Sequence, residues 1–337
     1  MKKVLLTTAA MALVASSSYG AGIIRFGDTY LGVNDQGHLN TPTYNGVTTN
    51  SSHTGLTYGG TVGTRPAGND ATSPGCLCEG WGVSASGVSG YANVSVGGVS
   101  NLTVDSFTSD AVDGSVVGTY ATSAVHLTGT PGISVTQAYA ASAASGVFQN
   151  TVTIKNTTGA AITDVRYVRV MDWDVPPTEF SEFVTIKGTA TTTQLELSHD
   201  DGFEVPDPLA ATGELTAGTT DVDFTDVGAS DHGAYFKFNF GSLADGESKT
   251  FSIFYGAAAN EAGALSALAT IGAELYSLGQ STNRAGGPAN DEATFIFAFK
   301  GVGGVVIETP DGGQTLGLLG ASMGLLGLVK RRLSRRA

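Results

Sequence analysis

The sequence predicts an all-β protein, a large antiparallel β-sandwich with one α-helix, and three observations support this. Glycine accounts for 47 of the 337 residues, about twice its usual share, and only 14% of the residues are charged. Glycine-rich chains with few charges favour short strands joined by turns over helical bundles. Aromatic residues alternate with other residues over 236–240, 251–255 and 295–299, the pattern of strands with one face in a core. A hydrophobic content of 41% is enough for that core and excludes global disorder.

Other segments support the same architecture. Residues 148–154 alternate as a half-buried strand, with Phe148, Val152 and Ile154 on one face. Residues 165–171 are apolar on both faces, which predicts a central strand covered on two sides. Residues 82–134 are rich in Gly, Ser, Thr and Val and predict further short strands. No segment of linker composition divides residues 21–307, so we expect one β-sandwich domain there.

One segment has the period of a helix rather than that of a strand. Asn260 is a suitable N-cap, Glu261 suits the first turn, and Gly279 is a natural stop. Between them, apolar residues recur at three- and four-residue spacing: Ala264, Leu265, Leu268, Ile271 and Leu275. This pattern predicts an α-helix near residues 260–277.

The N-terminus has the three parts of a secretory signal peptide. Lys2 and Lys3 precede an apolar run over residues 4–14, and small residues follow up to position 21. The run is too short to span ~30 Å of hydrocarbon. We therefore expect residues 1–20 to form a signal helix that is removed near Gly20.

The C-terminus, residues 308–337, also has three parts. A Pro/Gly turn at residues 309–313 comes first, and the stretch 312–329 carries no charge, a marginal length for a transmembrane helix. Five basic residues follow within 330–336 and hold that end in the cytoplasm. The sequence thus predicts that 312–329 enters the inner membrane transiently, and a plain C-terminal anchor is the alternative.

This ending resembles the PEP-CTERM sorting signals, in particular their Val-Pro-Asp-Gly/Ser-Gly variant. Pro310, Asp311, Gly312 and Gly313 match the variant, and Thr309 stands where Val is usual. The resemblance implies that an exosortase cuts near the motif and passes the body to the cell exterior of a Gram-negative bacterium that makes exopolysaccharide. Exosortase and exopolysaccharide are therefore the expected partners, and the expected location is the cell surface or the extracellular space.

The body also resembles uncharacterised exported proteins that often carry this tail. The resemblance depends on residues 168–174 and on residues 260–280. It implies a large antiparallel sandwich similar to the galactose-mutarotase-like supersandwiches, and this likeness of fold does not transfer a catalytic site.

The formal net charge of -13 bears on the partners. An acidic body is repelled by phosphate backbones, so the composition argues against nucleic acid as a partner. Cations and neutral polymers fit this charge better.

The two cysteines, Cys76 and Cys78, are separated by one residue. Outside the cell two cysteines normally pair, but a Cys-X-Cys bridge closes a very small ring. The sequence leaves open a disulfide, two free thiols or ligation of a metal. No histidine stands at zinc-finger spacing to complete a zinc site.

Clustered acids are the best candidates for a site. Asp172 and Asp174 flank a Trp, Asp200 and Asp201 follow His199, and a third group lies at 221–226. Carboxylates spaced by one or two residues near Gly-rich turns are the ligands that Ca²⁺ prefers. We expect calcium, if any cofactor, at Asp172, Asp174, Asp200 and Asp201, and the alternative is solvated loop acids.

The same residues permit an enzymatic interpretation. Asp172 or Asp174 with Glu179 or Glu182 resembles a glycosidase acid/base pair, and Trp173 is suited to stack on a sugar ring. No His-X-X-X-His pair and no Gly-X-Ser-X-Gly elbow marks another catalytic site. We therefore predict a non-catalytic structural or adhesive protein, with a carbohydrate-active enzyme (glycosidase or lyase) that uses the Asp172–Glu182 region as the alternative.

Overall fold

The computed structural model describes residues 20–42, 52–59, 69–112 and 117–307. Strands make up 50% of the structure and helices 5%, and this confirms the predicted all-β class. The predicted signal helix at 1–20, apart from its last residue, and the predicted sorting signal at 308–337 lie outside the described residues.

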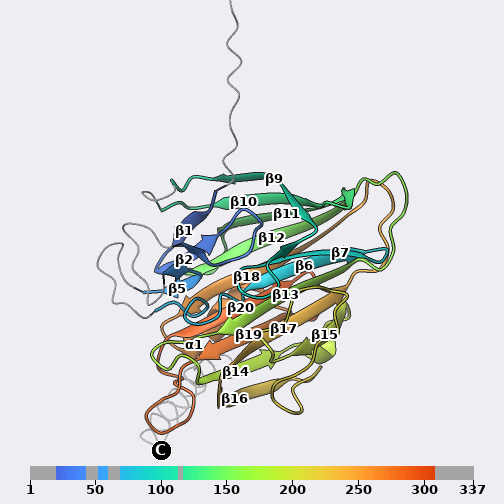
Figure 1. Cartoon of the computed structure of the whole chain (residues 1–337). Helices are drawn as coiled ribbons and strands as arrows, with labels where there is room; N and C mark the ends of the chain where they lie inside the picture. The colour runs from blue at the N-terminus through green and yellow to red at the C-terminus, as the bar shows by residue number, and fades with distance from the viewer. Residues whose placement is uncertain (1–19, 43–51, 60–68, 113–116, 308–337) are drawn as a thin grey trace, which may run out of the picture.

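The larger sheet has nine antiparallel strands in the order β16-β14-β19-β20-β18-β12-β11-β10-β9 (Figure 1). Its strands are β9 (Leu102–Ser109), β10 (Ala121–Leu127), β11 (Thr130–Ala141), β12 (Val147–Asn156), β14 (Glu182–Lys187), β16 (Phe224–Ser230), β18 (Ser248–Ala258), β19 (Leu275–Gln280) and β20 (Thr294–Lys300). Strands adjacent in sequence are paired at β9–β12, so that half of the sheet is a simple meander.

A six-stranded antiparallel sheet lies against it, in the order β15-β17-β13-β6-β7-β8 (Figure 1). Its strands are β6 (Gly80–Ala85), β7 (Val88–Asn93), β8 (Val99–Ser100), β13 (Arg166–Trp173), β15 (Leu195–His199) and β17 (His232–Asn239). A short 3₁₀ helix (Thr189–Thr191) precedes β15.

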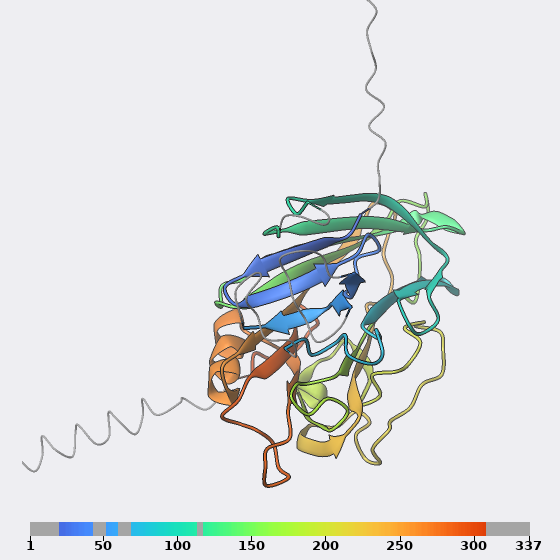
Figure 2. The ribbon, with the colours of Figure 1, turned by 60° about the vertical axis from the view of Figure 1, so that its left-hand side comes forward.

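Two small sheets come from the N-terminal part of the chain. Figure 2 shows the three strands of the first, in blue, side by side on the flank of the molecule. They are β1 (Gly22–Phe26), β2 (Thr29–Val33) and β5 (Leu56–Tyr58), and the second sheet pairs β3 (Thr41–Pro42) with β4 (His53–Thr54).

The two large sheets pack face to face through the aromatic stripes that the sequence predicted. Phe236 of β17 lies 5.6 Å from Phe297 of β20, between ring centroids, and Tyr167 of β13 lies 5.0 Å from Phe251 of β18. These rings belong to one hydrophobic cluster that draws on both sheets. Burial of aromatic area stabilises the packing of the two sheets by ~25 cal/mol per Å².

Strand β13 is a central strand with both faces covered, as its apolar run predicted. Tyr167, Met171 and Trp173 point into the core between the sheets. Val168 and Val170 point to the opposite face, where they form a second small cluster with Tyr235. Val168, Val170 and Asp172 on this face therefore lie outside the main core yet remain buried.

The predicted helix is present but shorter than expected. It is α1 (Glu261–Ile271), and the side chain of Asn260 accepts a hydrogen bond from the N–H of Gly263 as an N-cap. Gly272, not Gly279, ends it in the left-handed conformation at φ 66°. Leu275, expected on the helix, instead begins β19. The predicted helix was too long because Leu275, four residues after Ile271, continues the helical spacing of apolar residues although it belongs to a strand.

Helix α1 covers the outer face of the nine-stranded sheet. Its buried residues Ala264, Leu268 and Ile271 pack against Phe254 of β18 and Ile296 of β20. The residues next to Phe254 and Ile296 in sequence point the other way, into the core between the two large sheets. Strands β19 and β20 and the second half of β18 are therefore covered on both sides, which accounts for the nearly continuous burial of these segments.

A fully buried ion pair lies between the two sheets. Arg169 of β13 donates through Nε to the carboxylate of Glu79 and through Nη1 to Oε1 of Gln137, at 2.6 Å, on β11. Glu79 also accepts from the backbone N–H of Leu39 and from the hydroxyl of Tyr255. Because partners come from both sheets, this network fixes the register of one sheet on the other.

Candidate functional site: a buried carboxylate cluster

Three carboxyl groups meet where β13 ends. Asp172 lies in β13, Asp174 follows that strand, and Asp231 lies in the turn before β17. Asp172 is paired with Gly233 across the two strands, so the turn that carries Asp231 lies beside it. One oxygen from each of the three carboxyl groups can be chosen so that all lie within 4.8 Å of one another.

The alternation of β13 explains why Asp172 and Asp174 lie together. Trp173, between them, points into the main core, so its two neighbours point to the opposite face. The loop after β15 lies tightly on that face: a Cβ at Gly202 would lie 2.6 Å from the Cα of Asp172. On the other side, Asp174 donates its backbone N–H to the carbonyl of Ala71. The cluster is thus enclosed by two segments distant in sequence.

The two strand-end aspartates are buried without hydrogen-bond partners. Asp172 is 1% exposed and Asp174 is 0% exposed. Among the described residues, none donates a hydrogen bond of ordinary geometry to any of their four carboxylate oxygens. Buried polar atoms are nearly always paired, so this arrangement requires an explanation, and a cation is one. Asp231 is exposed and leaves the cluster an opening to solvent.

The electrostatics of the cluster follow from burial and from mutual repulsion. Burial raises the pKa of Asp172 well above its ordinary value, and the charges of Asp231 and Asp201 raise it further. Burial also raises the pKa of Asp174 to about 10, helped by the repulsion of Asp172 and Glu182. A bound divalent cation would reverse this situation, because it favours the ionised form of every carboxylate around it.

Glu182, the first residue of β14, lies at the margin of the cluster. Its Oε1 accepts a hydrogen bond from the backbone N–H of Val175, at 3.2 Å, and its Oε2 has no hydrogen-bond partner among the described residues. Burial raises the pKa of Glu182 to about 8. Its carboxylate does not belong to the three groups that converge.

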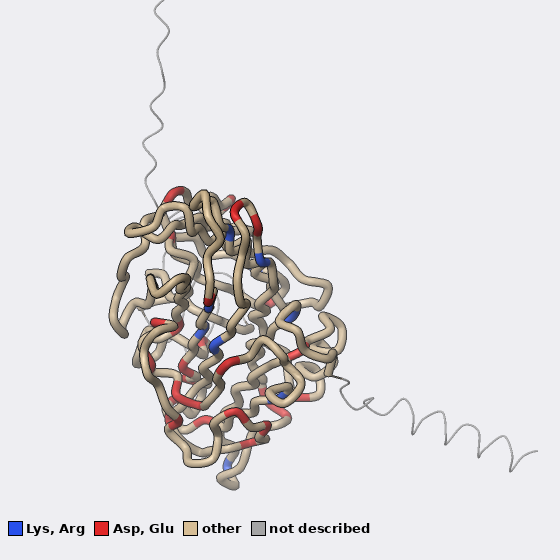
Figure 3. The backbone as a smooth tube through the Cα atoms, turned by 90° about the vertical axis from the view of Figure 1, so that its right-hand side faces the viewer, with Lys and Arg blue, Asp and Glu red and all other residues tan. Residues whose placement is uncertain are grey.

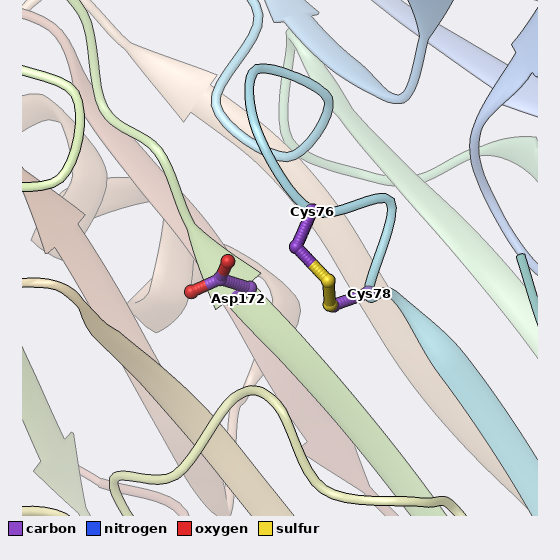
Figure 4. Close-up of side chains that lie close together, drawn as sticks. All are labelled: Cys76, Cys78 and Asp172. Carbon is purple, nitrogen blue, oxygen red and sulfur yellow. A yellow bond between two sulfur atoms is a disulfide. The ribbon is translucent and has the colours of Figure 1, made fainter. Parts of the chain in front are cut away.

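Cys76 and Cys78 are joined by a disulfide in the segment before β6. Figure 4 shows the disulfide beside Asp172, which comes from the end of β13. The two sulfurs and one carboxylate oxygen of Asp172 all lie within 4.8 Å of one another. Asp172 is therefore shared by two groups of potential metal ligands.

The structure places the other predicted calcium ligands differently. Asp200 accepts hydrogen bonds from the backbone N–H groups of Leu215 and Thr216 and from the hydroxyl of Thr219, and it contacts His232 at 3.1 Å. These hydrogen bonds hold the pKa of Asp200 well below its usual range although burial opposes them. Its oxygens thus serve to hold the loop at residues 214–219, and they do not converge with Asp172.

Asp201 lies near the cluster but outside it. Its Oδ1 accepts a hydrogen bond from the backbone N–H of Phe203, at 2.9 Å, and burial raises its pKa to about 6. The third acidic group forms loop contacts: Asp221 accepts from the N–H of Ser198, and Asp223 accepts from Gly188 and Thr189. These acids act in the described structure as loop anchors.

The geometry bears on the glycosidase alternative as well. Trp173 is fully buried, donates to the hydroxyl of Ser277 at 3.1 Å, and contacts Phe295, so its ring is not available to a sugar. Asp174 and Glu182 are both 0% exposed. A glycosidase needs two carboxyl groups open to substrate on either side of the scissile bond. Trp173, Asp174 and Glu182 are therefore closed to a substrate, whereas Glu179, the other acid of the predicted pair, is partly exposed.

Figure 3 shows how the charged residues are distributed over the molecule. Asp and Glu positions gather in the lower half of the view, the level at which Figure 1 shows β14–β17, while Lys and Arg positions are few and scattered. An excess of negative charge around a buried carboxylate cluster raises the local concentration of cations.

Sequence reasoning missed Asp231 and the pair of Arg169 and Glu79. Asp231 is separated from Asp172 by 59 positions, and only the pairing of β13 with β17 brings them together. Arg169 did carry a signal, because a basic residue inside the apolar run of a central strand is rarely buried without a partner.

No protein-family model matches this chain, and a search of curated proteins returns no match. Among the described residues, no helix is long and apolar enough to span a membrane.

The raised pKa values of these carboxyl groups predict that the protein becomes less stable as the pH rises. Most carboxyl groups in proteins have the opposite effect, because folding lowers their pKa values. A folded state with raised carboxyl pKa values binds more protons than the unfolded chain, so its free energy of unfolding falls as the pH rises. Burial lowers the pKa of His38 to about 3 and that of His199 to about 4, and these two groups act in the opposite sense below about pH 6.5. Because the pKa of Glu182 is about 8 and that of Asp174 about 10, the net fall should be clearest from about pH 6.5 to pH 8. Each group contributes at most about 1.4 kcal/mol per pH unit. Urea unfolding in the presence of a chelator, at several pH values, measures how the free energy of unfolding changes with pH. A free energy of unfolding that rises steadily to pH 8 would contradict the prediction.

Proposed function

We propose that this protein is an exported, non-catalytic β-sandwich protein of the cell surface or extracellular polymer matrix, and that its body binds a divalent cation. The cation is Ca²⁺, held by Asp172, Asp174 and Asp231. The observation that carries this proposal is the burial of four unpartnered carboxylate oxygens beside a third carboxyl group that opens to solvent. Buried charges of one sign are stable in a fold only when they are neutralised by protons or by a cation.

The chemistry of the donors favours calcium over other cations. All three groups offer hard carboxylate oxygens, and Ca²⁺ accepts six to eight oxygens in a flexible geometry that includes water and backbone carbonyls. Mg²⁺ demands a regular octahedron and sheds its water reluctantly, which suits a mostly buried cluster less well. A bound Ca²⁺ would tie the end of β13 to the turn before β17 and so strengthen the six-stranded sheet.

The exported location rests on the sequence. The signal peptide at 1–20 and the tail at 308–337, with Pro310–Gly313, predict export, cleavage by an exosortase and release to a matrix that contains exopolysaccharide. The body at 21–307 is then the mature domain, and its two large antiparallel sheets agree with the supersandwich analogy. Extracellular calcium is abundant enough to occupy sites of modest affinity.

A comparison of melting temperatures tests the calcium proposal. The purified protein should melt a few degrees higher in Ca²⁺, because a ligand at a hundredfold excess over its Kd stabilises the folded state by about 2.7 kcal/mol. NaCl at matched ionic strength reproduces screening but not ligation, and Mg²⁺ tests selectivity. Equal shifts in all three salts would overturn the proposal and leave the acids as solvated groups.

A further inference from the structure

Asp172 belongs to two groups of potential ligands, one with oxygen donors only and one with two sulfurs. With Asp174 and Asp231 it offers three carboxylates, and with Cys76 and Cys78 it offers a carboxylate and two sulfurs. Each group has its donor atoms within 4.8 Å of one another. Asp172 itself is buried and unpartnered, so its oxygens are available to either group.

We propose that reduction of the Cys76–Cys78 disulfide creates a second metal site, for a borderline divalent cation of the zinc type. The ligands are the thiolates of Cys76 and Cys78 and the carboxylate of Asp172, and water takes the fourth tetrahedral position. Thiolates, not disulfide sulfurs, are the strong ligands of such ions. The inference shares Asp172 with the proposed calcium site and otherwise does not depend on it.

The backbone around the cysteines is held in place without the disulfide. The N–H of Leu77 donates to the hydroxyl of Ser95 at 3.0 Å, and the carbonyl of Leu77 accepts from the N–H of Ser95. The side chain of Asn93 donates to the carbonyl of Cys78 at 2.6 Å. Because these contacts tie the segment to the turn after β7, the two sulfurs should stay near Asp172 after reduction.

Exposure indicates how the reduction proceeds. Cys78 is fully buried, whereas Cys76 is only partly buried and follows the exposed Gly75. A thiolate of a small dithiol attacks the Sγ of Cys76, the S–S bond breaks, and its electron pair leaves on the Sγ of Cys78. The second thiol of the reagent then displaces Cys76, so two electrons and two protons pass to the protein and the reagent becomes a cyclic disulfide. Metal binding releases the protons from the two thiols.

Cobalt provides the readout, because Co²⁺ occupies zinc sites and its thiolate bonds absorb in the near ultraviolet. The full-length protein is reduced with dithiothreitol, freed of reagent under argon and titrated with Co²⁺ and Zn²⁺, alongside the oxidised protein. We expect a thiolate–Co²⁺ band only in the reduced protein, and zinc affinity on the order of 100-fold above that of the oxidised protein. Equal zinc affinity in both forms, or a folded reduced protein without the band, would overturn the inference.

Variants separate this site from the calcium site. Cys76→Ser should lose the band and keep the calcium-dependent rise in melting temperature, whereas Asp231→Asn should lose that rise and keep the band. Asp172→Asn should weaken both. Circular dichroism of the reduced wild type shows whether the fold persists, so the central comparison does not depend on any variant. If the wild type shows no calcium-dependent rise in melting temperature but reduced Asp231→Asn keeps the thiolate–Co²⁺ band, the thiolate site is supported. That result overturns only the calcium proposal.

Discussion

Replacement of Arg169 by Met should destabilise the protein by about 3–5 kcal/mol, because it leaves the carboxylate of Glu79 buried without its cation. Arg169 and Glu79 are both fully buried between the sheets. Met fills a similar volume, so the loss reports the uncompensated charge more than a cavity. Urea unfolding at pH 7 measures the change in the free energy of unfolding.

Arg166→Met is the matched control for this experiment. Arg166 lies on the same strand and pairs with Asp164 and Glu196 in partly solvent-exposed ion pairs. Such pairs contribute about 0–1 kcal/mol, so the control should lose little. The double variant Glu79→Gln/Arg169→Met should recover part of the loss, since it removes both charges. Losses of equal size at Arg169 and Arg166 would contradict the structural role given to the buried pair.

Asp174→Asn should have opposite effects in the absence and in the presence of calcium. Burial and repulsion raise the pKa of Asp174 to about 10, so at pH 8 the folded protein bears the cost of keeping this carboxyl protonated. Asn has the same shape without that cost and should stabilise the calcium-free protein by about 2–4 kcal/mol at pH 8 and by nearly nothing at pH 4. The same variant should lose the calcium-dependent rise in melting temperature, because one ligand is missing.

Asp105→Asn controls for the loss of one negative charge. Asp105 is exposed on β9, the edge strand of the nine-stranded sheet, and pairs with His126 at 2.7 Å, whereas the cluster lies on the six-stranded sheet. The control should show the wild-type response to calcium and no gain in stability at pH 8. If Asp174→Asn responds to calcium as Asp105→Asn does, Asp174 is not a ligand.

The sequence predicted the sandwich well because its signals are local. The stripes at Phe236, Phe251 and Phe295 repeat every second residue, and such repeats depend only on which face of a strand is buried. The N-cap Asn260 was likewise predicted from local chemistry. The predicted end of the helix was wrong because Leu275, the first residue of β19, continues the helical spacing of apolar residues.

The site was only half predictable because its geometry is not local. Asp172 and Asp174 were identified from their spacing, but their convergence with Asp231 depends on the pairing of β13 with β17. Asp200 has the same local pattern of neighbouring acids, yet its oxygens hold a loop. Asp200 accepts hydrogen bonds from loop residues, whereas Asp172 has no hydrogen-bond donor among the described residues. The spacing of acids in the sequence cannot distinguish these two cases, because they differ only in how distant loops fold over each side chain.

Calorimetric titration of the calcium-free protein with Ca²⁺ tests the central claim most directly. We predict saturable binding of about one ion per chain in 0.15 M NaCl, with loss of that binding in Asp174→Asn and its retention in Asp105→Asn. Saturable binding requires ligands that converge, whereas scattered surface acids give only weak binding that salt screens. Absence of saturable binding in the wild type, or equal binding in the wild type and Asp174→Asn, would contradict the account.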